Sequence, residues 1–262
     1  MWLLVYKLVR PIMPISSGLA TWIIAQSCGA TFTASLAAAI SMALGTIGAS
    51  FYHYGGAAWM YARKSERFKF KDPEIIRLLG LLMFGISICI ATIYLPKECV
   101  FICVFNTLAI AAYSAKLSSH WMTKNITMTL VCATPIIMGW QSGETTHPVI
   151  YWGLGLAFLS YFAREVIKDV QDIKANEGKR VTLPMILGTD RVLQIAGALL
   201  VIATIVSFGM MQSINNPIQI GLTIGAALIF LVTGTILLIS KKAWRCEMLI
   251  QASVCLLLLA LW

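Results

Sequence analysis

Long apolar stretches separated by short polar connections are the feature that most constrains this chain. A helix that crosses the hydrocarbon core of a bilayer needs about 20 mostly apolar residues, because lipid offers no partner to an unpaired backbone amide. Stretches of this kind lie near residues 12–30, 34–61, 75–95, 99–115, 125–142, 148–167, 190–211, 217–240 and 246–262. The sequence therefore predicts an all-α fold, a polytopic membrane bundle of about nine transmembrane helices.

The composition supports a membrane location and leaves no room for a soluble domain. Hydrophobic residues make up 59% of the chain, and the mean hydropathy is +0.82. Charged residues make up 12%, whereas a soluble domain carries about 25%. We therefore expect residues 1–262 to form one transmembrane domain. Glycine, proline and serine interrupt several apolar stretches, as is typical of closely packed helices around a central, lipid-facing cavity.

The positions of lysine and arginine predict the orientation. With nine spans, 19 of the 20 basic residues fall on the side of the N-terminus, and Lys97 alone falls on the other side. Basic residues gather in cytoplasmic loops, so we expect the N-terminus and the polar connections 62–74, 114–125 and 168–184 to be cytoplasmic. The positive charge serves topology alone, or it also attracts anionic lipids or a phosphorylated substrate.

One cytoplasmic connection carries a cluster of acidic side chains. The sequence AREVIKDVQDIKAN covers residues 163–176 and follows an apolar stretch directly. If the helix continues to Asn176, then Glu165, Asp169, Asp172 and Asn176 fall within about 60° of arc on one helix face. Carboxylate and amide oxygens are ligands for a hard cation such as Mg²⁺. One interpretation of this stretch is therefore a site for a hard cation on the stripe.

A second interpretation of the same stretch needs no ligand. The acidic side chains also lie within reach of three basic residues, Arg164, Lys168 and Lys174. In that case the stretch is a solvated helix end with ordinary ion pairs. The spacing alone leaves both interpretations open.

Residues 163–188, AREVIKDVQDIKANEGKRVTLPMILG, resemble the second aspartate-rich motif of the UbiA superfamily of intramembrane prenyltransferases. They are most similar to the branch that makes archaeal-type ether lipids. Residues 7–24 resemble the opening segment of that family at Arg10 and Pro11. Residues 113–139 resemble its connection between the fourth and fifth helices. The resemblance therefore covers nearly the whole chain.

The resemblance implies a fold, a reaction and a set of site residues. The fold would be a helical bundle whose cavity opens to the bilayer. Two aspartate-rich motifs would hold Mg²⁺, which binds the diphosphate of an isoprenoid donor before an acceptor is alkylated. The catalytic residues would be Glu165, Lys168, Asp169 and Asp172, and Asp169 and Asp172 would be the metal ligands. Four further residues would bind the substrate, namely Tyr113, Asn125, Arg164 and Asn176.

The chain also departs from the family pattern. The first motif of the family is typically NDxxDxxxD, but residues 48–69 contain neither aspartate nor asparagine. In the second motif, Asn176 stands where an aspartate is expected. Ser118 stands where the family often has a lysine, and Lys116 lies two residues earlier. Half of the metal cage is thus absent, so we do not expect a two-metal diphosphate site.

Basic and aromatic residues occupy the place of the first motif. Arg63, Lys64 and Arg67 would bind a phosphate directly, or they serve topology alone. His53, which lies between two tyrosines, would act as an acid or base or bind the acceptor. Its other interpretation is a hydrogen-bonded structural histidine.

Three functions follow from these observations. The first is a divergent prenyl-transfer enzyme that uses one metal ion or none. The second is a non-catalytic membrane subunit or assembly partner that binds a lipid, quinone or carotenoid. The third is a cyclase or hydrolase that uses His53, Glu165 or Tyr113. In each case we expect a membrane lipid or isoprenoid as the ligand, a protein partner for the second, and no nucleic acid.

Overall fold

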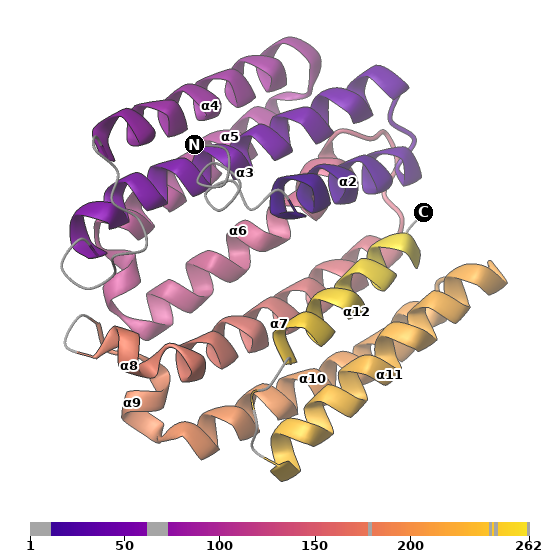
Figure 1. Ribbon diagram of the computed structural model, residues 1–262. Helices are drawn as coiled ribbons and strands as arrows, with labels where there is room; N and C mark the ends of the chain where they lie inside the picture. The colour runs from indigo at the N-terminus through magenta and orange to yellow at the C-terminus, as the bar shows by residue number, and fades with distance from the viewer. Residues whose placement is uncertain (1–11, 62–72, 178–179, 241–242, 244–245, 261–262) are drawn as a thin grey trace. The chain divides into compact units, whose positions relative to one another are not determined.

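The computed structural model describes residues 12–61, 73–177, 180–240, 243 and 246–260. Within these residues the regular secondary structure is helical, apart from one isolated bridge between His120 and Val181. The longer helices are α2 (Ile12–Ser27), α3 (Phe32–Tyr61), α4 (Pro73–Tyr94), α5 (Lys97–Ala115), α6 (Trp121–Gln141), α7 (Val149–Gln171), α10 (Thr189–Met211), α11 (Pro217–Ser240) and α12 (Cys246–Ala260) (Figure 1). The short ones are the 3-10 helix Leu117–Ser119, α8 (Ile173–Asn176) and α9 (Leu183–Leu187). The predicted all-α fold is confirmed.

Each predicted apolar stretch coincides with one of the longer helices. Within the described residues, five helices are long and apolar enough to cross a membrane, namely α3, α4, α5, α10 and α11. The others are either shorter, such as α12 with 15 residues, or more polar, such as α7 with its charged last turns. The number of nine spans therefore stays a prediction, as do the single domain and the central cavity.

Apolar side chains are exposed along the spanning helices. Leu78 and Leu82 on α4, Phe101 on α5, Ile205 on α10 and Ile239 on α11 are all more than half exposed. Soluble proteins rarely expose contiguous apolar surface on this scale. These side chains are suited to contact lipid, as in an integral membrane protein.

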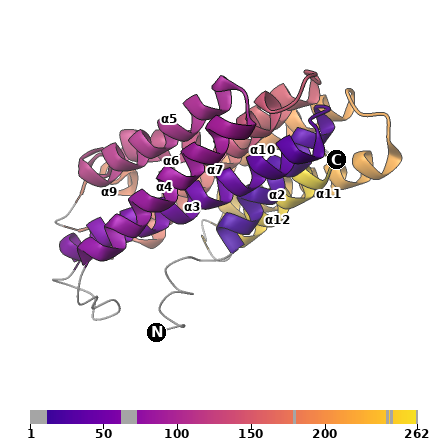
Figure 2. The ribbon, with the colours of Figure 1, turned by 90° about the horizontal axis from the view of Figure 1, so that it is seen from above.

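The described chain divides into two compact units, and the division falls within α6 beside Pro135. The first unit comprises residues 1–116 and 134–145, and the second comprises residues 117–133 and 146–262. In the first unit α3 and α4 lie side by side (Figure 2). A Cβ atom on Gly80 would lie 2.6 Å from the backbone nitrogen of Tyr52, so only glycine permits this approach.

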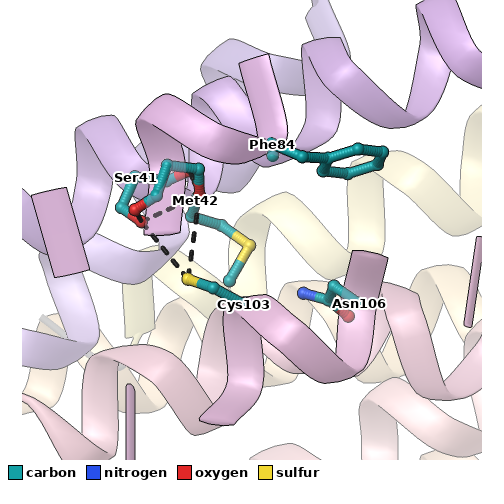
Figure 3. Close-up of a pocket in the computed structure, with 7 residues that line it drawn as sticks. Ser41, Met42, Phe84, Cys103 and Asn106 are labelled. Atoms are coloured by element: carbon teal, nitrogen blue, oxygen red, sulfur yellow. Dashed lines mark hydrogen bonds between the residues drawn. The ribbon is translucent and has the colours of Figure 1, made fainter. Parts of the chain in front are cut away.

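Hydrogen bonds join α3, α4 and α5 inside the first unit. The Ser41 hydroxyl lies 3.0 Å from the Ser87 hydroxyl and 3.3 Å from Cys103 Sγ. Figure 3 shows Ser41, Cys103 and Asn106 beside a pocket between these helices. Asn106 Nδ2 donates to Thr134 Oγ1 at 2.9 Å, and its Oδ1 has no partner. Serine hydroxyls thus hold the helices together where lipid supplies no hydrophobic drive.

In the second unit α10 and α11 cross at a pair of glycines. A Cβ atom on Gly197 would lie 2.8 Å from the Gly234 carbonyl oxygen, and one on Gly234 would lie 2.9 Å from the Gly197 carbonyl oxygen. The two backbones therefore touch directly. α7 packs against both α10 and α12, so its charged last turns lie inside this unit.

Candidate functional site: a buried charge network on α6, α7 and α12

The last two turns of α7 bury charged side chains. Glu165 is 2% exposed and Asp169 is 0% exposed, and Arg164 on the same helix is buried as well. The two carboxylates are four residues apart, so they lie on one face of α7, as the sequence predicted. Ionised groups are rarely buried unless they are paired. Their partners therefore decide what this site can do.

Lys124, in the first turn of α6, is the partner of both carboxylates. Its ammonium donates a hydrogen bond to Asp169 Oδ1 and lies 3.8 Å from Glu165 Oε2. The side chain is itself buried, at 4% exposure. In the sequence analysis Lys124 was one of the 19 basic residues that indicated only the orientation. The available signal was the neighbouring Asn125, a predicted site residue, whose Nδ2 donates to Asp169 Oδ2 at 3.2 Å.

Arginine and lysine hold the other oxygen of Glu165. Arg164 Nη1 donates to Glu165 Oε1 at 3.0 Å, and Lys168 Nζ donates to the same oxygen at 3.1 Å. Arg164 Nη2 also reaches Glu247 Oε1 on α12, at 3.4 Å. We call these six residues, Lys124, Arg164, Glu165, Lys168, Asp169 and Glu247, the charge network. It contains three carboxylates and three cations, so its net charge is zero.

The remaining residues of the predicted stripe lie apart from this network. An uninterrupted helix to Asn176 is wrong, because α7 ends at Gln171 and Asp172 takes φ −96° and ψ 11° before α8 begins. Aspartate is a poor residue for a helix interior, since its side chain competes for backbone groups. The Asp172 side chain is exposed. Asn176 is buried, and its Oδ1 accepts from Arg180 Nε at 2.9 Å.

The described residues do not fit a cage for Mg²⁺. Among them, no group of three histidine, cysteine, aspartate or glutamate side chains comes together to hold a metal ion. Both oxygens of Asp169 already accept hydrogen bonds, from Lys124 and Asn125. Mg²⁺ requires such oxygens as direct ligands at about 2.0–2.1 Å. A metal ion shared by Asp169 and Asp172 stays a prediction, and this geometry weighs against it.

The ion-pair interpretation of the acidic stretch agrees with the structure in part, and the metal site stays a prediction. The pairing of Glu165 with Arg164 and Lys168 is present, as the ion-pair interpretation required. However, Arg164 and Glu165 are buried rather than solvated, and Lys168 is 27% exposed. Lys174 is exposed and does not take part in the network.

The other predicted site residues fall in the first unit or outside the described residues. His53 Nδ1 lies 3.3 Å from Ser114 Oγ, and its ring centroid lies 5.2 Å from that of Tyr113. His53 is half-buried and Tyr113 is buried. These contacts suit a hydrogen-bonded structural histidine and leave an acid–base role as a prediction. Arg63, Lys64 and Arg67 lie outside the described residues.

The fold and the site define an all-helical integral membrane protein that buries charged side chains at the end of α7. The chain belongs to the UbiA prenyltransferase family, whose model matches residues 69–255. It is similar to the digeranylgeranylglyceryl phosphate synthase of Methanopyrus kandleri, with 25% identity over 126 residues, 48% of this chain and 46% of the relative. It is also similar to the synthase of that name from Natronomonas pharaonis, with 26% identity over 140 residues, 52% of this chain and 49% of the relative. The matched part thus spans about half the length of these curated relatives.

Solved structures show the same fold over the full length. One, from work on the biosynthesis of digeranylgeranylglyceryl phosphate synthase in membranes, has a TM-score of 0.77 and 16% identity, covering 98% of this chain and 96% of that chain. Another is a UbiA homologue from Archaeoglobus fulgidus bound to DMAPP and Mg²⁺, with a TM-score of 0.68 and 13% identity, covering 98% of each chain. The UbiA fold predicted from the sequence is confirmed.

Proposed function

We propose that this protein binds a prenyl diphosphate at the cytoplasmic end of α7 and transfers its isoprenoid to an acceptor. The observation that carries the proposal is the charge network. Four of its six charged side chains are buried. Burying charges in a membrane protein costs free energy, and such charges mark ligand or ion sites. The relatives named for digeranylgeranylglyceryl phosphate synthesis and the DMAPP-bound homologue support this ligand class.

The donors for the diphosphate come from the segment that follows α7. Asn176 Nδ2 and Thr182 Oγ1 are buried and have no hydrogen-bond partner. Arg180 donates only its Nε to Asn176, and it forms no ion pair with a carboxylate of the described chain. Its two terminal amino groups are suited to bind phosphate oxygens in a bidentate manner. An anion with several acceptor oxygens would therefore satisfy two buried groups that lack partners and pair with the Arg180 guanidinium.

The transfer step breaks the bond between C1 of the isoprenoid and the diphosphate oxygen. The diphosphate leaves with the bonding electron pair, and an allylic cation remains. A nucleophilic atom of the acceptor then supplies the electron pair for the new bond and loses a proton to water or to the released diphosphate. In this step Arg180 stabilises the charge that develops on the leaving group. We assign no step to Mg²⁺, because the described residues do not fit a cage for it.

The test is calorimetric binding of geranylgeranyl diphosphate to the purified full-length protein, in EDTA and in Mg²⁺. We expect Arg180→Gln to weaken binding at least tenfold, because a bidentate charged contact to phosphate is lost. Lys97→Gln is the control, since it removes the same charge at the predicted opposite face, and it should bind like the native protein. Equal affinity of all three proteins would refute the proposed site. Binding that requires Mg²⁺ and is lost in Asp172→Asn would restore the metal site predicted from the sequence.

A second candidate function is a non-catalytic subunit or assembly partner that holds a lipid, quinone or carotenoid. The observation that favours it is the neutral charge network, whose carboxylates already have partners. The absence of aspartate and asparagine from residues 48–69 also favours it. Purification in mild detergent separates the two functions. A stoichiometric protein partner and no turnover of geranylgeranyl diphosphate support the subunit, whereas turnover by the isolated protein excludes it.

A further inference from the structure

Lys124 occupies the position between two carboxylates that a metal ion would otherwise take. Its ammonium bonds Asp169 Oδ1 and lies 3.8 Å from Glu165 Oε2, while the remaining oxygen of each carboxylate has partners of its own. All four carboxylate oxygens are therefore occupied by a cation or an amide. A divalent ion would have to displace the ammonium before it could reach them.

The backbone that carries Lys124 is held in place. The Lys124 amide donates to the His120 carbonyl at 3.0 Å, which starts α6. The Val181 amide donates to the Ser119 carbonyl at 3.3 Å, and His120 pairs with Val181 in the isolated bridge. The start of α6 is thus tied to the segment after α8, and the lysine is buried at 4% exposure. A buried side chain on an anchored turn is not free to swing into solvent.

The charge balance points the same way. With Lys124 present, the network has three cations for three carboxylates, whereas without it two cations would remain for three carboxylates. Adding a divalent ion to a neutral buried network would leave two uncompensated positive charges, which burial strongly disfavours. Removing the lysine would leave a carboxylate in need of a cation.

We propose that Lys124 is a built-in cation that replaces a divalent metal ion at the Glu165–Asp169 pair, so that this pair binds no metal in the native protein. The proposal goes beyond the proposed function, because it concerns the carboxylates whether or not a prenyl diphosphate binds. It also distinguishes this chain from a protein in which the same carboxylates gather metal ions. The pair is a positioning element that ties α6 to α7 and leaves anion binding to other groups.

The test uses Mn²⁺ as the probe and electron paramagnetic resonance of the free ion as the readout. Mn²⁺ shares the preference of Mg²⁺ for carboxylate oxygens, and no prenyl diphosphate is added, so this result is independent of the proposed function. We expect Lys124→Met to bind about one equivalent of Mn²⁺ that the native protein does not bind. The double variant Lys124→Met/Asp169→Asn is the matched control and should lose that equivalent.

Two results would overturn the proposal. One is an equivalent of Mn²⁺ bound by the native protein and lost in the double variant, because the lysine would then not exclude the metal. The other is equal Mn²⁺ binding by Lys124→Met and the double variant. If Lys124→Met does not fold, Mn²⁺ binding by the native protein and by the double variant still tests the proposal. The double variant lacks both the Lys124 ammonium and the Asp169 carboxylate. The proposal then requires that the native protein bind no more Mn²⁺ than the double variant.

Discussion

Removing the Lys124 ammonium should destabilise the protein far more than removing an exposed lysine. At 3.8 Å from Glu165 Oε2, one unit-charge pair is worth about 4 kcal/mol at an effective dielectric constant of about 20. The ammonium also forms an ion pair with Asp169, and desolvation offsets part of both attractions. Breaking a buried pair on one side typically costs about 3–5 kcal/mol, because the other charge stays buried. We therefore expect Lys124→Met to lower the free energy of unfolding by about 3–5 kcal/mol.

The assay is equilibrium unfolding in mixed micelles of a mild detergent and SDS, followed by tryptophan fluorescence, with EDTA present. The exposed Lys174→Met is the control and should stay within about 0.5 kcal/mol of the native protein. Lys124→Met/Asp169→Asn should recover at least about 2 kcal/mol relative to Lys124→Met, since the two residues interact directly. The reasoning would be refuted by a loss below about 1 kcal/mol in Lys124→Met, or by additive losses in the double variant.

Three further predictions concern helix packing, the ion pair between Arg164 and Glu247, and the orientation of the C-terminus. Gly234→Ala should lower the free energy of unfolding by about 1–3 kcal/mol, because its Cβ would meet the Gly197 carbonyl. A Cβ at Gly221 on the same helix meets nothing within 4 Å, so Gly221→Ala should be neutral or stabilising. Equal unfolding midpoints of the two variants in mixed micelles would contradict this prediction. Glu247→Gln should cost about 1–2 kcal/mol in the same assay, between the values for exposed and buried pairs, because Glu247 is 26% exposed and holds the buried Arg164; no change would remove it from the network. Alkaline phosphatase fused to the C-terminus should be active in a bacterial host and green fluorescent protein dark, as nine spans require; the reverse result would rule out that number.

Much of the fold could be predicted from the sequence because lipid imposes a simple rule. A run such as residues 217–240 has no alternative to a helix once it is placed in a bilayer, and the structure has α11 at those residues. The close approach of Gly197 and Gly234 could not be predicted, since the chain contains 19 glycines and only two of them make this crossing. Periodicity identifies a helix, but it does not identify the neighbour against which the helix packs.

The same limit explains what was missed at the site. Glu165 and Asp169 were found because their spacing of four residues puts them on one face of any helix. Lys124 was missed because its partner Asp169 lies 45 residues away in the chain, and a lysine at the start of an apolar stretch is usually a topology signal. Asp172 was placed on the stripe because the helix was extended by one turn without a break. Local spacing thus predicted the two carboxylates, and only the tertiary structure identified Lys124 as their shared cation.

The missing first motif and the pairing of Glu165 and Asp169 with Lys124 act in the same direction. A chain with no aspartate or asparagine in residues 48–69 has fewer carboxylates to be neutralised, and the pair that remains buried on α7 is neutralised by Lys124. Each feature lowers the need for a metal ion, and under the proposed function together they leave recognition of the diphosphate to cationic and amide groups. In this chain Arg180, Asn176 and Thr182 have unused donors. On the proposed function, the network is a scaffold that fixes α7 and the segment after it, so that these donors would be held in place for a phosphate.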